Sequence, residues 1–232
     1  FQIGEGGPFN KGEIKKDKAE IDRLKELWSD GKGLEIFDKE RSKTHGELWE
    51  KALTIMLYKI LPEFLVVRAS EHDDIKNGID NYLLDENGNA ICGLDEVSTD
   101  DESELHQIKS DKVENKNIEG GATIKYGLAF NKENNIVKDT IKNIPVFYIR
   151  ISGEKLVTLL KAIYTNPSLD KISDVEFEIF DELTASLKRQ IERERNNEKI
   201  PEIVQEKICN FSDSLARMQE IKDEKYQQKH KE

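Results

Sequence analysis

The chain has 232 residues with a formal net charge of −11, and apolar and charged residues each make up 36% of it. This length can bury a core, and the large charged share predicts long solvated helical faces beside it. The acidity disfavours broad electrostatic binding of nucleic acid, which relies on Lys and Arg. The 2 cysteines lie far apart, which excludes a disulfide framework and predicts a cytoplasmic protein. No apolar run is long enough to predict a membrane segment.

The N-terminal part, residues 1–43, is predicted to be a helical segment. Residues 13–29 carry one apolar stripe with helical spacing, and the run SDGKG after it favours the end of that helix. Residues 44–61 carry a wider apolar face and predict a second, longer helix. Pro62 follows this face, at a position where a helix is expected to end.

Strand signals dominate the middle of the chain. Runs of β-branched or alternating apolar residues occupy four stretches, residues 63–70, 78–98, 122–130 and 144–151. The second stretch contains Asn87-Gly88, which favours a tight hairpin turn. The polar residues 99–119 predict mostly loop with a short helix at residues 104–109, and residues 155–164 predict a helix.

The C-terminal part, residues 171–232, is predicted to be a helical extension. Pro201 follows a polar loop and marks the start of a further helix. Five apolar residues then repeat at spacings of four and three, which is a heptad seam: Val204, Ile208, Phe211, Leu215 and Met218. The seam fits a helical hairpin within the chain, and it equally fits a homo-oligomer or a partner helix.

The order of these elements predicts a mixed α/β (α+β) fold. A small mixed central sheet flanked by helices occupies residues 44–170, between the N-terminal segment and the helical extension.

Acidic residues stand at the open end of the predicted hairpin. With two or four residues in the turn, paired positions sum to 175, so Asp80 faces Asp95. Their Cβ atoms are then about 4.5–5.5 Å apart. A turn of odd length shifts the register and brings Glu96 toward Asp80 instead. Like charges this close are destabilising unless a cation neutralises them, and carboxylate oxygens suit a divalent cation.

Glu47 stands one turn into the helix predicted at residues 44–61. One interpretation is a capping box, in which its carboxylate accepts a hydrogen bond from the N–H of Thr44. The other directs Glu47 toward the open end of the hairpin. The second interpretation is favoured by the order of three features along the chain: a helical acid, a Gly-x-Asp strand start and a second acidic strand end.

This order of acids resembles the restriction-endonuclease-like superfamily, the PD-(D/E)XK nucleases, over residues 44–151. Glu47 matches the helical acid of that family. Gly78-Ile79-Asp80 matches its second motif, and Leu94-Asp95-Glu96-Val97-Ser98 matches its third. The resemblance implies a Mg²⁺- or Mn²⁺-dependent endonuclease that hydrolyses phosphodiester bonds in DNA.

The resemblance also implies roles for the acids. Asp80, with Asp95 or Glu96, holds the metal, which stabilises charge on the phosphoryl group and activates a bound water. Glu47 binds a second metal or orients that water.

The family has a Lys two residues after the acid of its third motif, where this chain has Val97 or Ser98. We expect Lys125 to take that role from another strand, with Lys109 as the second choice. The missing Lys leaves another function open, in which a catalytically inactive scaffold binds partner proteins through its C-terminal helices.

Overall fold

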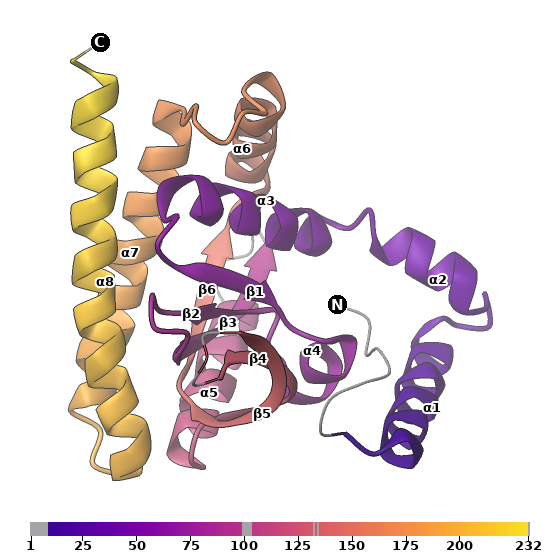
Figure 1. Cartoon of the computed structure of the whole chain (residues 1–232). Coiled ribbons are helices and arrows are strands. Elements are labelled where there is room, and N and C mark those ends of the chain that lie inside the picture. The colour runs from indigo at the N-terminus through magenta and orange to yellow at the C-terminus, as the bar shows by residue number, and fades with distance from the viewer. Residues whose placement is uncertain (1–8, 99–103, 132, 134, 232) are drawn as a thin grey trace.

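A four-stranded mixed sheet forms the centre of the molecule (Figure 1). The computed structural model describes residues 9–98, 104–131, 133 and 135–231. The sheet order is β1 (Leu65–Arg68), β2 (Asn81–Leu84), β3 (Ala90–Ser98) and β6 (Val146–Ile151). The first three strands are antiparallel neighbours, whereas β6 runs parallel to β3. The fold is therefore mixed α/β with a small central sheet flanked by helices, as predicted.

One face of the sheet packs on helices. They are α3 (His45–Ile60), α6 (Gly153–Thr165), α7 (Asp174–Arg195) and α8 (Glu202–Lys229). The apolar stripe of α3 places Trp49, Leu53 and Met56 fully inside this core. Thr44 caps the start of α3, because its Oγ1 accepts a hydrogen bond from the N–H of Glu47. The reciprocal bond of the predicted capping box is not formed, since the N–H of Thr44 donates to the C=O of Arg41.

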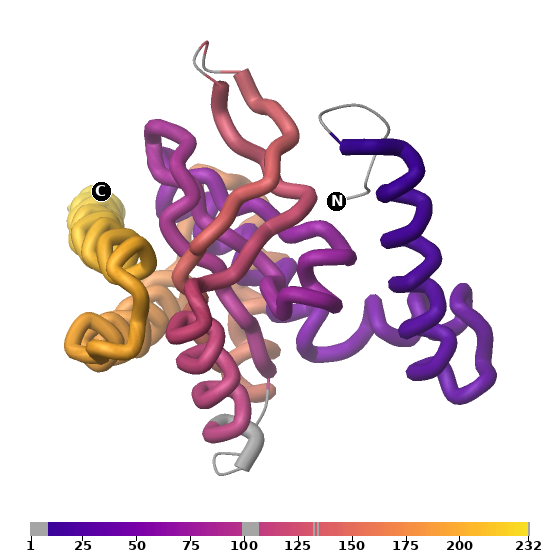
Figure 2. The backbone as a smooth tube through the Cα atoms, turned by 90° about the horizontal axis from the view of Figure 1, so that it is seen from below, coloured from indigo at the N-terminus to yellow at the C-terminus, as the bar shows by residue number. Residues whose placement is uncertain are grey.

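The opposite face packs on α5 (Glu104–Ile118) and on a separate two-stranded sheet. This second sheet consists of β4 (Ala122–Phe130) and β5 (Ile136–Ile144), and it projects from the core as a long ribbon (Figure 2). The strand predicted at residues 122–130 is confirmed.

Helix α5 is longer than predicted. It buries the apolar side chain of Val113 but is also anchored by a polar one, because the amide of Asn117 bonds both the C=O and the N–H of Val146. Hydrophobic spacing misses a helix that is held in this way. The beginning of the predicted stretch, residues 99–103, lies outside the described residues.

The N-terminal helices α1 (Lys11–Trp28) and α2 (Leu34–Arg41) lie on the side of the molecule away from α7 and α8 (Figures 1 and 2). Helix α4 (Glu71–Asn77) lies between them and the sheet. The segment predicted as helical is helical where it is described, and residues 1–8 lie outside the described residues. Within the described part of the chain, no helix has the length and apolar character needed to cross a membrane.

The heptad seam of α8 packs within the chain. All five seam residues are buried in the same core as the sheet. The ring of Phe211 lies 4.9 Å from that of Phe147 on β6, and α7 runs alongside α8 (Figure 1). The C-terminal helices therefore form a hairpin that completes the core.

Candidate functional site

The hairpin of β2 and β3 has the predicted register near its open end. Asn81 pairs with Leu94 and Tyr82 with Gly93, whereas an irregularity next to Leu84 pairs that residue with Ala90 rather than Ile91. The turn therefore has an odd length, since Asp85 pairs with Asn89, and not the even length that predicts this register. The irregularity between Leu83 and Leu84 restores the predicted register toward Asp80 and Asp95.

Asp80 extends the pairing of the two strands with its side chain. Its N–H donates to the C=O of Leu94 at 2.9 Å, and its Oδ2 accepts from the N–H of Glu96 at 2.6 Å. A carboxylate thus occupies the place of a backbone carbonyl in the ladder. This bond places the carboxylate of Asp80 directly at the strand end that carries Asp95 and Glu96.

Asp95 and Glu96 point to opposite faces of β3, as strand alternation requires. Asp95 Oδ1 lies 2.7 Å from Lys109 Nζ, while Glu96 Oε1 accepts from Asn81 Nδ2 at 2.7 Å. The second oxygen of each carboxylate, Asp95 Oδ2 and Glu96 Oε2, is buried without a hydrogen-bond partner among the described residues. Buried carboxylate oxygens of this kind need a proton or a cation.

The surroundings of Asp80 and Glu96 favour the protonated forms of these two acids. Burial raises the pKa of Glu96 well above its usual value, and the charge of Asp80 raises it further. Burial also raises the pKa of Asp80, with added contributions from Asp74 and Glu50. Ionisation of either carboxylate therefore carries a cost, chiefly from burial, that a proton or a cation would remove.

Glu50 is a site residue that the sequence reasoning missed. It is 7% exposed, and its Oε2 lies 2.6 Å from Arg68 Nη2. Burial, together with the charge of Glu47, raises the pKa of Glu50 to about 7. A signal existed in the sequence, because Glu50 interrupts the apolar face of α3 beside Trp49.

Glu47, the predicted helical acid, lies on the outer side of this cluster. Its Oε2 is 2.8 Å from Arg68 Nη2, and its Oε1 is 3.6 Å from Arg41 Nε. Arg41 comes from α2 and also binds Asp74 at 2.5 Å. The two arginines line a cavity of about 410 Å³ beside these acids.

Lys125, the predicted substitute for the family's Lys, lies elsewhere. Its Nζ is 2.7 Å from Glu13 and 2.6 Å from Asp17, both on α1. The acids of the N-terminal helix hold this side chain, and so the expectation that it reaches Asp80 is not met. Lys109, the second choice, reaches the site through its bond to Asp95.

Two further lysines of α5 approach the site. Lys109, Lys112 and Lys116 have helical spacing and share one face of α5. A Cβ on Gly78 would lie 3.5 Å from Lys112 Nζ, 3.4 Å from Lys116 Nζ and 3.9 Å from Asp95 Oδ2. These three groups therefore surround the left-handed glycine that ends α4. Burial lowers the pKa of Lys116, and the charges of Lys112 and Lys109 lower it further.

The donor chemistry of the cluster fits a hard divalent cation, because its ligands are carboxylate oxygens and two of them lack partners. No set of three or more His, Cys, Asp or Glu side chains is gathered as a ligand group within the described ranges. Mg²⁺ needs only one or two protein carboxylates when water and substrate phosphates complete its shell. Asp80 with either neighbouring acid satisfies that requirement.

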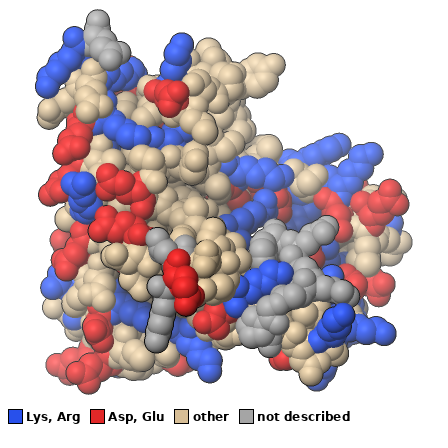
Figure 3. Space-filling view, viewed as in Figure 1, with Lys and Arg blue, Asp and Glu red and all other residues tan. Residues whose placement is uncertain are grey.

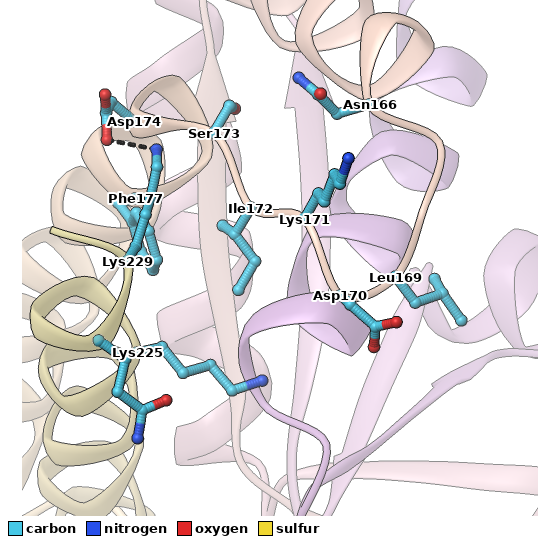
Figure 4. Close-up of a pocket in the computed structure, with 11 residues that line it drawn as sticks. Asn166, Leu169, Asp170, Lys171, Ile172, Ser173, Asp174, Phe177, Lys225 and Lys229 are labelled. Atoms are coloured by element: carbon cyan, nitrogen blue, oxygen red, sulfur yellow. Dashed lines mark hydrogen bonds and ion pairs between the residues drawn. The ribbon is translucent and has the colours of Figure 1, made fainter. Parts of the chain in front are cut away.

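Another cavity, of about 610 Å³, lies between the α6–α7 connection and the end of α8 (Figure 4). Two of its lysines have partners within the chain. Lys229 Nζ lies 2.6 Å from Asp174, and Lys225 Nζ donates to the carbonyl of Lys59 at 2.7 Å. We assign no chemistry to this cavity.

No protein-family model, curated protein or solved structure matches the chain. Function has to be inferred from the site itself.

Proposed function

We propose that the chain is a Mg²⁺-dependent nuclease that hydrolyses phosphodiester bonds in DNA, as its resemblance to the restriction-endonuclease-like superfamily implies. One observation carries the proposal. The carboxylate of Asp80 bonds the strand end that carries Asp95 and Glu96 on its two faces, and one buried oxygen of each of these two acids has no hydrogen-bond partner among the described residues.

Asp80, together with Asp95 Oδ2 or Glu96 Oε2, would hold the metal. When bound, Mg²⁺ stabilises charge on the transferring phosphoryl group and lowers the pKa of its water. Asn81 orients Glu96 through its hydrogen bond, and the backbone N–H of Glu96 orients Asp80. Because the acids release protons when they bind a cation, metal affinity rises with pH.

The lysines of α5 replace the Lys that the family places two residues after the acid. Lys109 neutralises one oxygen of Asp95 at 2.7 Å. Lys116 is a second candidate for proton transfer from water, since burial lowers its pKa, and its Nζ donates to the C=O of Asn77. Glu50 and Arg68 add an acid and a guanidinium that lie 2.6 Å apart, and the charge of Glu50 acts on both Asp80 and Glu96.

The alternative, an inactive scaffold that binds partners through the C-terminal helices, drew on the seam of α8. That seam is packed within the chain. The site thus favours the nuclease.

The test is cleavage of single- and double-stranded DNA by the purified chain in Mg²⁺ or Mn²⁺. We expect Asp80→Asn and Glu96→Gln each to reduce the rate by ~100-fold or more, in line with the loss of one essential charged group. Glu86→Gln is the matched control, since Glu86 is exposed in the turn of the same hairpin.

Metal-dependent cleavage that persists in Asp80→Asn rules out this site. A wild-type chain that cleaves neither substrate with either metal contradicts the nuclease itself.

A further inference from the structure

A cavity of about 700 Å³ lies at the end of β6, where α6 begins and α7 passes. Three of its lining residues are basic and come from three elements: Arg150 on β6, Lys155 on α6 and Arg189 on α7. The hydroxyls of Ser152 and Ser186 also line it. Such a convergence is notable in a chain whose net charge is −11.

This basic cavity adjoins the acids of the hairpin. Tyr148, which lines the cavity, is the register partner of Asp95 on the neighbouring strand. Paired residues of adjacent strands lie about 5 Å apart. The charges of Arg150 and Asp95 act in opposite directions on the pKa of Tyr148, which burial raises. Both charges therefore lie near the side chain of Tyr148.

The single acid among the lining residues does not cancel the basic charge. Glu182 pairs with Lys155 at 2.5 Å, but the two side chains are 56% and 50% exposed. An ion pair this exposed contributes little energy, so Lys155 can turn to another anion. Helix α6 begins at the cavity, with Ser152 as its N-cap, and its dipole adds positive potential.

We infer that this basic cavity binds the phosphodiester backbone of the nucleic acid strand whose phosphate reaches the carboxylate site. The inference rests on the proposed function and adds the position of the strand. Guanidinium and ammonium groups bind phosphate oxygens through charge-assisted hydrogen bonds. The strand enters over Tyr148, with its reacting phosphate at Asp95 and its next phosphates among Arg150, Lys155 and Arg189.

The experiment measures binding of a fluorescent single-stranded DNA and of its duplex to the full chain in EDTA, where no metal-dependent cleavage occurs. The double variant Lys155→Ala/Arg189→Ala removes two exposed side chains. We expect its affinity to fall by roughly tenfold. The slope of log K against log[salt] should fall by about 1.4 for the single strand and about 1.8 for the duplex, for two lost phosphate contacts.

The matched control is Lys161→Ala/Lys188→Ala, which removes two exposed lysines from the same two helices outside the cavity. Apart from the small effect of two lost charges on the net charge, its affinity and its salt slope should stay within twofold of the wild-type values. Equal effects of the two double variants, or no DNA binding by the wild type, overturn the inference. Binding through the cavity without any cleavage in Mg²⁺ overturns the proposed nuclease alone.

Discussion

Glu50 couples the charge of the site to the stability of the fold. Its carboxylate is buried beside Glu47, and its pKa rises to about 7 from 4.5. A folded-state pKa above the unfolded value means that the native state binds more protons between these two values. Stability is therefore lost as pH rises from about 4.5 to about 7, by up to roughly 3 kcal/mol.

We predict that Glu50→Gln stabilises the chain at pH 8, because the neutral amide removes the cost of a buried charge. The expected gain in unfolding free energy is about 1–3 kcal/mol at pH 8 and close to zero at pH 4.5. Urea unfolding at the two pH values measures it, with the exposed Glu86→Gln as control. An equal change at both pH values would show that the effect is not ionisation of Glu50.

At the scale of elements, α5 decides which lysines reach the acids. The helix is fixed to β6 by the amide of Asn117, which accepts from the N–H of Val146 at 2.8 Å and donates to its C=O at 2.9 Å. The same amide nitrogen donates to Glu194 of α7 at 2.5 Å. One side chain thus joins a helix, a strand and a second helix.

We predict that Asn117→Ala lowers the unfolding free energy by about 2–3 kcal/mol, because two buried backbone groups lose their partner. It also loosens α5, so DNA cleavage should fall by more than the loss of folded protein explains. Asn115→Ala is the control, as this side chain is exposed on the same helix. Urea unfolding and cleavage rates measure the two effects. An unchanged unfolding free energy would show that Asn117 does not anchor α5.

Over the whole molecule, one core joins the sheet to the C-terminal helices. Phe211 of α8 is completely buried and contacts Phe147 of β6. On the face shown in Figure 3, acidic and basic side chains are interspersed, and neither sign dominates it. The buried core that joins the sheet to α7 and α8 is apolar, and its burial holds the C-terminal helices against the sheet.

We predict that Phe211→Ala destabilises the whole chain by about 3–5 kcal/mol, because it leaves a cavity in the shared core. Sheet and helices should unfold in one transition, observed both by circular dichroism and by tryptophan fluorescence from Trp49 in α3. Tyr164→Ala is the control, since Tyr164 is 89% exposed and should change stability little. Two separate transitions would instead make residues 171–232 an independent unit.

The hairpin and its acids could be predicted from local sequence. The pairing of Asn81 with Leu94 matches the predicted register at the open end, but the turn at Asn87-Gly88 has an odd length, and an irregularity at Leu84 compensates for it. The apolar faces of α3 and α8 could also be predicted, because the helical spacing of apolar residues indicates which side of a helix is buried. These features depend on neighbours a few residues apart.

The basic partners of the acids could not be predicted in the same way. Lys125 is held by Asp17 on α1, whereas Lys109 and its neighbours are brought in by α5. Both outcomes depend on how elements distant in sequence pack, and no local pattern encodes that packing. The sequence thus places the carboxylates at one strand end, but the packing of α5 against β6 selects the lysines that meet them.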